Sequence, residues 1–320
     1  MGNFSKALRR PETYVGQARE LLSTARCAVT YPLGVIDQIV TTGRPGGDAT
    51  HDTPVLLVHG FAHNRSGWFV LQDHLRRAGF SSVHTLNYNP WRHDIPQLAA
   101  RLAERVAQVK AITGAERVHV VGHSLGGLII RWYVQELGGD LDVNTAVTIA
   151  SPHEGSQLAL FPVPGRTAHE LRPGSWVIRR LADGARASDV RWIAYYSNLD
   201  MLVSPGVSAM IRPAAMQATN IFVADHGHVG IMVSPLVARS VTAQLEAAHG
   251  VTGHNPRLGA LDRSEGEDEM FLADAREANG GFGIRSCATQ VDHDTLAVLA
   301  VDDVVAGFQA QALGSGGAHG

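Results

Sequence analysis

Apolar and polar residues alternate in blocks that predict strands and helices in turn along most of the chain. The uninterrupted apolar run 55–58 is typical of a strand that is buried on both faces. In 94–112, apolar residues recur at helical spacing, and Gly114 is suited to end that helix. By the same reasoning we predict further strands over 83–86, 118–121, 146–150, 192–196 and 221–224, and helices over 66–78, 125–137 and 235–249.

This order of elements predicts the α/β class, with a mostly parallel central sheet and helices on both of its faces. A segment over about 155–189, with prolines at 162, 164 and 173, interrupts the alternation between the fourth and fifth recognised strands. We expect this segment to fold over the edge of the sheet as a cap. The domain that carries the sheet is predicted to span 51–250.

Both ends of the chain are expected to lie outside that domain. Residues 1–50 predict an N-terminal helix and a linker: Pro11 suits the first helical position, apolar residues follow at helical spacing to Val29, and Pro32 is expected to end the helix. Residues 251–320 predict a C-terminal extension, partly disordered, because they include an acidic run and a glycine-rich end. We expect one helix within this extension, over 295–313.

The composition is that of a globular protein. Of the 320 residues, 45% are hydrophobic and 18% are charged, and the net charge of -3 lacks the basic excess that nucleic-acid binding requires. Cys27 and Cys287 lie far apart and form no motif, so the sequence implies neither a disulfide framework nor a cysteine metal site.

Charged residues argue against insertion of the N-terminal helix into a membrane. Arg19, Glu20 and Arg26 interrupt its apolar residues, so it does not resemble a secretory signal. The sequence also has no run of about 18 apolar residues, as a membrane span needs. We therefore expect a cytoplasmic protein whose N-terminal helix either covers the sheet or makes peripheral contact with a membrane surface.

The chemistry is concentrated in a G-x-S-x-G motif at residues 122–127, Gly-His-Ser-Leu-Gly-Gly, which follows a predicted strand and begins a predicted helix. The turn between such elements is sharp and leaves no room for side chains, which explains the glycines. It raises the serine hydroxyl above the sheet, at a helix N-terminus whose dipole favours negative charge. Ser124 is therefore the predicted nucleophile, and the alternative is a bystander serine in a glycine-rich turn.

A second motif, His59-Gly60-Phe61, follows the first buried strand. A tetrahedral intermediate needs backbone N–H donors aimed at its oxyanion. We expect the N–H groups of Phe61 and Leu125 to form this oxyanion hole, and His59 itself to be a structural hydrogen-bonding residue.

An acid is expected after the fifth strand. Asp200 lies there, at the carboxyl end of the predicted sheet, where α/β proteins collect catalytic residues. A loop aspartate can instead serve as a turn residue. Glu154, after the fourth strand, is the rival acid.

The base is expected after the sixth strand, where two histidines lie close together. We prefer His228, because Gly227 gives its backbone freedom to turn the imidazole toward the serine. His226 is placed to pair with the neighbouring Asp225. A metal site in this loop is the alternative, although no other cysteine or histidine cluster completes it.

Together these motifs resemble the bacterial lipase and esterase branch of the α/β-hydrolases, over about 54–248. The resemblance lies in the two motifs above, in Ser-Pro-His-Glu-Gly-Ser at 151–156, in Leu-Asp-Met-Leu-Val at 199–203, and in Gly-His-Val-Gly at 227–230. It implies ester hydrolysis, no organic cofactor and a movable cap. The family's opening antiparallel strands are not evident in 1–50, and 251–320 has no counterpart.

We predict a serine hydrolase that cleaves carboxylic esters, lipids among them, through an acyl-enzyme, with Ser124, Asp200 and His228 as its triad and neither metal nor cofactor. An acyltransferase or an amidase would use the same triad. From another class, a non-catalytic lipid-binding or scaffold protein would have no need of all three residues. Apolar residues of the cap either line an acyl pocket or pack in the core: Leu158, Leu160, Phe161, Trp176, Val177 and Ile178.

Overall fold

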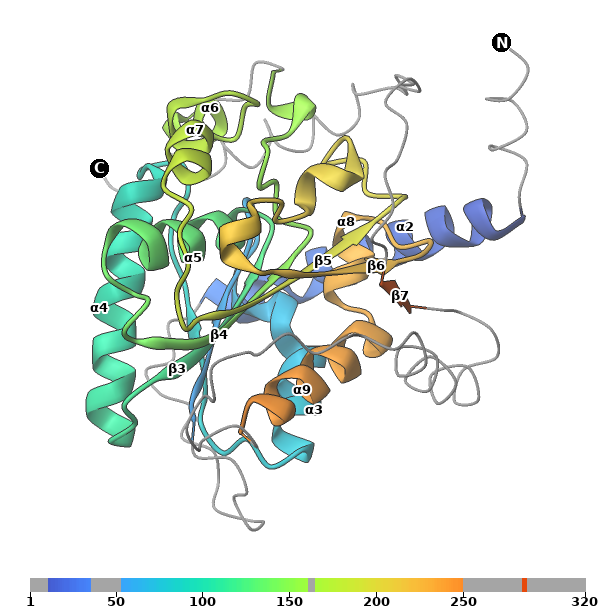
Figure 1. Ribbon diagram of the computed structural model, residues 1–320. Helices are drawn as coiled ribbons and strands as arrows, with labels where there is room; N and C mark the ends of the chain where they lie inside the picture. The colour runs from blue at the N-terminus through green and yellow to red at the C-terminus, as the bar shows by residue number, and fades with distance from the viewer. Residues whose placement is uncertain (1–10, 36–52, 161–164, 250–283, 287–320) are drawn as a thin grey trace, which may run out of the picture.

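The computed structural model describes residues 11–35, 53–160, 165–249 and 284–286, and it is built around one sheet (Figure 1). The sheet has seven strands in the order β2-β1-β3-β4-β5-β6-β7. The first six are parallel, and β7 pairs antiparallel with β6 at the edge. The strands are β1 Val55–Val58, β2 Val83–Leu86, β3 Val118–His123, β4 Val143–Ile149, β5 Arg191–Ser197, β6 Thr219–Val223 and β7 Ile284–Ser286.

All six strands predicted from the sequence are present, and the α/β class with a mostly parallel sheet is confirmed. Their bounds differ by a few residues; β4, for example, begins at Val143 rather than at 146. The strand order reverses direction between β1 and β3. In open α/β sheets, the crevice beyond the carboxyl ends of two such strands is the usual binding site.

Helices cover both faces of the sheet, as predicted. One apolar cluster joins β1 and β3 to α4, α5 and α7 on one face, and another joins the sheet to α3, α8 and α9 on the opposite face. These helices are α3 Phe69–Arg77, α4 Ile95–Thr113, α5 Leu125–Glu136, α7 Trp176–Asp183, α8 His228–Met232 and α9 Pro235–His249. Asp94 and Gln97 form a capping box at the start of α4, and Gly114 ends it in a left-handed conformation.

The N-terminal helix, α2 (Pro11–Val35), is longer than the sequence predicts. Pro32 lies inside the helix, so the prediction that it ends the helix is wrong. The last carbonyl groups of α2 find partners outside it, which supports the turn that a proline would otherwise weaken. Side chains of the segment that includes the 3₁₀ helix η1 (Arg65–Trp68) and of the loop after β2 donate to them: Asn64 to Tyr31 O, Arg65 to Leu33 O and Asn87 to Gly34 O.

The cap lies between β4 and β5, where the sequence places it. Its described elements are the 3₁₀ helix η2 (Gln157–Leu160), the short helix α6 (Arg166–Glu170) and α7. Two of its side chains fasten it to α4 and the loop before it: the Thr167 hydroxyl donates to the carbonyl oxygen of Pro90, at 2.9 Å, and the Glu170 carboxylate accepts the N–H of Ile95, at 2.7 Å. Figure 1 accordingly shows α6 and α7 beside one end of α4.

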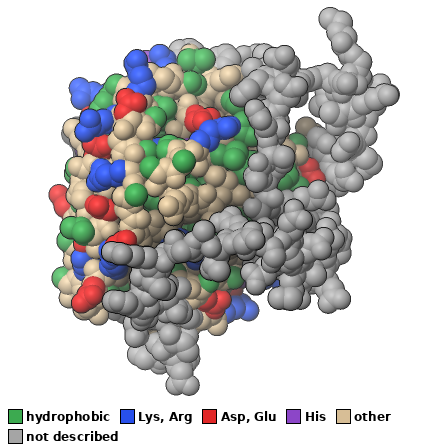
Figure 2. Space-filling model, in the orientation of Figure 1, with side chains coloured by type: hydrophobic (Ala, Val, Ile, Leu, Met, Phe, Trp, Pro, Cys, Tyr) green, Lys and Arg blue, Asp and Glu red, His purple; other side chains and the backbone are tan. Residues whose placement is uncertain are grey.

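After the cap, two further 3₁₀ helices, η3 (Gly206–Ala209) and η4 (Ala214–Met216), lead from β5 to β6. Figure 2 shows acidic and basic side chains interspersed over one face of the molecule. Within the described ranges, no helix is long and apolar enough to cross a bilayer. The linker, the acidic run and the helix predicted over 295–313 lie outside the described residues, and the predicted domain boundaries stay predictions.

Candidate active site

Ser124 stands at the sharp turn between β3 and α5. Its backbone has a φ of 53° and a ψ of -120°, a conformation that residues other than glycine rarely adopt. The backbone N–H of Ser124 donates to Ile149 O at 2.9 Å, which ties the turn to β4. Although Ser124 is the N-cap residue of α5, its side chain makes no capping hydrogen bond. The hydroxyl is therefore not engaged in holding the helix.

Close packing around Ser124, against backbone and side-chain atoms, requires the glycines of this turn. A Cβ atom on Gly122 would lie 2.6 Å from Gly127 N, and one on Gly126 would lie 2.2 Å from Val58 O. A Cβ atom on Gly127 would lie 2.0 Å from the Ser151 hydroxyl. A side chain at any of the three positions would clash, so the glycines let the turn pack closely, with Gly126 directly against Val58 of β1.

The loop after β1 lies directly against this turn. A Cβ atom on Gly60 would lie 3.0 Å from the Cβ atom of Ser124. Phe61, the next residue, therefore has its backbone close to the serine, as the oxyanion-hole prediction requires. Leu125 is the first residue of α5, where a helix offers no acceptor for the N–H group.

His59 has a structural role, in agreement with the sequence analysis. Its ring stacks on Tyr88 with centroids 4.1 Å apart, Nδ1 donates to Gly60 O, and Nε2 accepts the N–H of Tyr88. Burial lowers its pKa to about 3, so the ring stays neutral. These contacts hold the loop that carries Gly60 and Phe61.

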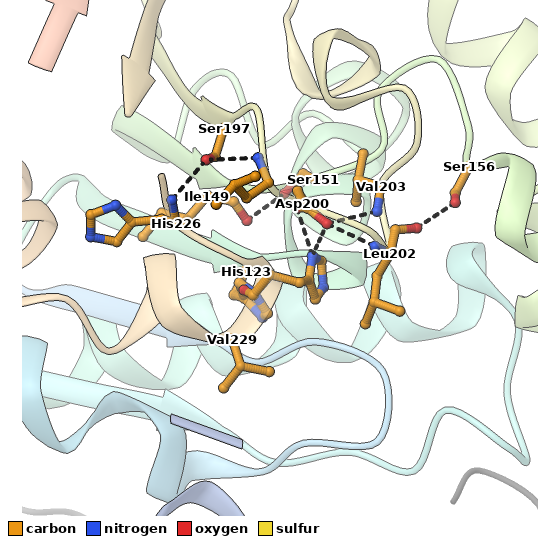
Figure 3. A network of polar contacts seen from close by, with 12 residues as sticks. His123, Ile149, Ser151, Ser156, Ser197, Asp200, Leu202, Val203, His226 and Val229 are labelled. Atoms are coloured by element: carbon orange, nitrogen blue, oxygen red, sulfur yellow. Dashed lines mark hydrogen bonds and ion pairs between the residues drawn. The ribbon is translucent and has the colours of Figure 1, made fainter. Parts of the chain in front are cut away.

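Asp200 lies in the loop after β5 and points toward His228. Its Oδ1 accepts the N–H groups of Leu202 at 2.9 Å and Val203 at 2.8 Å (Figure 3). Nδ1 of His228 lies 3.0 Å from Oδ1 and 2.8 Å from Oδ2. Both side chains are almost fully buried. The structure thus brings the predicted acid and base together in a hydrogen bond.

The pKa of His228 reflects two opposing causes. Burial opposes the charged imidazolium, but the charge and hydrogen bond of Asp200 outweigh it, so that the pKa is raised above its ordinary 6.5. His123 and His63, which also influence this site, have lowered pKa values because burial disfavours their charged forms. Of these three histidines, His228 is the one whose pKa is raised, so it is the one best suited to take up a proton.

His123 connects the nucleophile turn to the base, and the sequence analysis assigned it no role. It precedes Ser124, its ring lies 4.6 Å from that of His228, and its Nε2 donates to His228 O at 2.9 Å. The contact spans 105 residues of sequence, and no local pattern points to it. It places the predicted base beside the turn that carries the predicted nucleophile.

His226 is held elsewhere. Nδ1 of its ring lies 2.7 Å from Ala224 O, and Nε2 lies 3.0 Å from the Ser234 hydroxyl. The backbone N–H of His226 donates to the Ser197 hydroxyl (Figure 3). The ring is therefore used to join the end of β6 to the start of α9, rather than to pair with Asp225 as the sequence suggests.

The rival acid, Glu154, forms an ion pair with Arg212 at 2.8 Å, and both side chains are about half exposed. Such a pair at the surface contributes little. Glu154 is thus paired with Arg212, whereas Asp200 contacts a histidine.

The apolar residues of the cap divide between core and surface. Val177 and Ile178 are buried in the cluster with α4 and α5 and serve as core. Trp176 and Leu160 are more than half exposed, and the rings of Trp176 and Trp132 form a T-shaped pair with centroids 5.4 Å apart. Phe161 lies outside the described residues.

Comparison with known proteins identifies the fold. Residues 53–168 match the family model of the α/β hydrolase fold. A triacylglycerol lipase of Pseudarthrobacter phenanthrenivorans is 37% identical over 116 residues, which are 34% of this chain and 35% of that lipase. One from Burkholderia plantarii is equally similar over 34% of this chain and 32% of the lipase. The matched part thus spans about a third of these relatives.

A solved structure agrees on the architecture. Lipase B of Aspergillus fumigatus superposes with a TM-score of 0.56 at 20% identity, covering 65% of this chain and 55% of that one. At this identity, the likeness shows the fold alone.

Proposed function

We propose that this chain, an α/β-hydrolase by its fold, is a serine hydrolase that cleaves carboxylic esters through an acyl-enzyme. One observation carries the proposal: the buried hydrogen bond between Asp200 and His228, beside the strained turn that presents Ser124. A nucleophile, a base and an acid that orients the base are the parts of such a triad. The lipases that resemble part of this chain support the choice of esters.

In the proposed first step, Nε2 of His228 takes the proton from the Ser124 hydroxyl as the oxygen attacks the ester carbonyl. Asp200 holds the proton on Nδ1 and stabilises the imidazolium that forms. The N–H groups of Phe61 and Leu125 bind the oxyanion. His228 then gives its proton to the leaving alcohol, and the acyl group remains on Ser124.

In the second step, a water molecule donates its proton to His228 and attacks the acyl-enzyme. The carboxylic acid leaves, and the proton returns to Ser124. An acyltransferase would admit an alcohol or another acceptor in place of water, and an amidase would accept an amide in the first step. Neither alternative is favoured by a contact that the structure describes.

The test is covalent labelling with a fluorophosphonate, followed by a panel of p-nitrophenyl esters of rising chain length. We expect one label per chain, on Ser124, and ester hydrolysis that the label abolishes. A folded protein that neither takes the label nor hydrolyses any ester would instead be a scaffold. Hydroxylamine or an alcohol added as acceptor separates transfer from hydrolysis.

Peripheral membrane contact through α2 forms a second part of the proposal. One face of α2 packs against the rest of the protein, and Gly16 and Cys27 are buried on that face. Its outward face carries Leu21, Leu22, Val29 and Leu33, which are 73%, 70%, 80% and 61% exposed. A row of this kind, flanked by Arg19 and Arg26, is typical of helices that lie on a lipid surface.

Co-sedimentation with anionic phospholipid vesicles tests this contact. We expect the full chain to pellet with the vesicles and a Leu22→Gln, Val29→Gln double variant to remain in the supernatant with its fold intact. Equal pelleting of the two proteins, or none of either, would exclude the outward face of α2 as a lipid contact.

A further inference from the structure

Glu20, in the middle of α2, contacts the loop that carries the proposed base. Its Oε1 accepts the N–H of Val229 at 2.8 Å, and its Oε2 accepts the N–H of Gly230 at 2.7 Å. The two residues directly follow His228. Figure 1 shows α2 and α8 side by side.

These two N–H groups would otherwise lack partners within the helix. Val229 and Gly230 are the second and third residues of α8, and the first N–H groups of any helix find no acceptor within it. A side chain at the N-cap position usually supplies one. Here the N-cap residue is Gly227, which has none. Glu20 therefore serves as the cap of α8 from 209 residues away.

The glycines of this loop leave space for Glu20. A Cβ atom on Gly227 would lie 2.3 Å from the Cδ atom of Glu20, and one on Gly230 would lie 2.9 Å from Oε2. On the same helix, a Cβ atom on Gly16 would lie 2.4 Å from Leu199, the neighbour of Asp200. The inner face of α2 thus packs both against the residues around His228 and against the loop that carries Asp200.

We propose that Glu20 is a positioning residue for His228: by capping α8 it fixes the backbone of the base relative to Asp200 and Ser124. This inference rests on the proposed function, since it assigns Glu20 a part in the same active site. Glu20 touches neither substrate nor the reacting atoms.

The charge of Glu20 has a second effect on the base. The groups that influence His228 are Asp200 from the β5 loop, Glu20 from α2, His123 from the end of β3 and His63 from the loop after β1. His123 and His63 have lowered pKa values and stay neutral. Burial lowers the pKa of His228, Asp200 raises it most, and Glu20 raises it further. Removal of the Glu20 charge should lower that pKa.

The variant Glu20→Gln tests both effects with little change of shape. The amide keeps one acceptor but turns its NH₂ group toward the other backbone N–H, and it carries no charge. Glu104→Gln is the matched control: it removes the same charge from an exposed position on α4, on the opposite face of the sheet. Melting temperature and circular dichroism establish that each variant is folded.

Two measurements follow, on the full chain. In the first, kcat and KM for a p-nitrophenyl ester are determined across pH. We expect Glu20→Gln to lower kcat about tenfold with KM nearly unchanged, and to move the acidic limb of kcat/KM to lower pH by about half a unit or more. The control should match the wild type.

In the second, the ring of His228 is titrated by NMR, with His228→Ala used to assign its signal. This readout does not depend on catalysis. We expect the same downward shift of the pKa in Glu20→Gln. A glutamate that only stabilises the fold would lower the melting temperature and leave the pKa of His228 and the acidic limb unmoved, and that result would overturn the inference.

The two measurements also separate this inference from the proposed function. If the wild type neither hydrolyses esters nor takes the fluorophosphonate label, the proposed function fails. The Glu20 inference also fails if the pKa of His228 is the same in Glu20→Gln as in the wild type. A lowered pKa in the variant would show that Glu20 still sets the protonation state of His228, in a protein with another function.

Discussion

Gly126 lies so close to Val58 that a Cβ atom on the glycine would stand 2.2 Å from the carbonyl oxygen of the valine. Because glycine lacks this atom, the start of α5 can pack directly against the end of β1. This packing brings the loop that carries Phe61 next to Ser124. Both parts of the proposed oxyanion hole, in the loop after β1 and at the start of α5, thus lie next to this contact.

Gly126→Ala should therefore damage both the fold and the activity. The neighbours of the new methyl group are backbone atoms of Val58 and His59, which cannot turn away. We expect a loss of about 2 kcal/mol or more in the free energy of unfolding, measured by urea denaturation. Gly138→Ala is the control: its φ of 77° is strained but nothing lies within 4 Å, so a loss of about 1 kcal/mol is expected. Equal losses in the two variants would contradict the packing argument.

Ser124→Ala should remove the proposed nucleophile and leave the fold intact, because the hydroxyl caps no helix. We expect esterase activity to fall by a factor on the order of 10⁶ and the fluorophosphonate label to be lost. Hydrolysis of a short-chain ester by the variant at more than a tenth of the wild-type rate would rule out Ser124 as the nucleophile.

Asp200→Asn should keep the fold and lower kcat by about 10⁴, since the amide no longer holds the proton on Nδ1 of His228. Glu154→Gln is the comparison, and we expect it to retain most of the activity because its ion pair with Arg212 is half exposed. If the change at Glu154 proves the more damaging one, Asp200 is not the acid of the triad.

His228→Ala should be nearly inactive, whereas His226→Ala should keep most of its activity on the same ester. The ring of His226 joins Ala224 to Ser234, so its loss is expected to lower stability instead. Thermal unfolding measured beside the ester assay separates the two effects. The reverse pattern of activity would reassign the base to His226.

Activity should depend on pH through the neutral form of His228. A base with a raised pKa is protonated over a wider acidic range, so kcat/KM should rise with pH along a limb whose midpoint lies above 6.5. The control is the melting temperature over the same pH range. It should not fall on the acidic side together with kcat/KM. A midpoint clearly below 6.5 would mean that another group titrates.

The sequence was sufficient to predict the six parallel strands and the turn at Ser124, because each depends on local pattern. A run such as 55–58 has one way to be buried, and glycines at fixed spacing mark a sharp turn. Chain order limited the candidate acids and bases to the loops that meet at one edge of the sheet, and Gly227 favoured His228 over His226; these assignments stay predictions.

Other features depend on contacts between distant parts of the chain and leave no local signal. α2 continues past Pro32 because residues after β1 and β2 hold its last carbonyl groups. The three-residue strand β7 is too short to show a period of two, and it forms by pairing with β6. Glu20 belongs to an ordinary amphipathic helix until the structure places it against α8.

The contact of Glu20 with α8 also orders events during synthesis. Glu20 is translated before α8, because Val229 and Gly230 follow it by 209 and 210 residues. The proposed base therefore lacks its full support until strands β1 to β6 have all been translated. A partly made chain that ends before α8 would contain the proposed nucleophile, Ser124, but not the proposed base, so we expect it to be inactive towards esters until it is complete and folded.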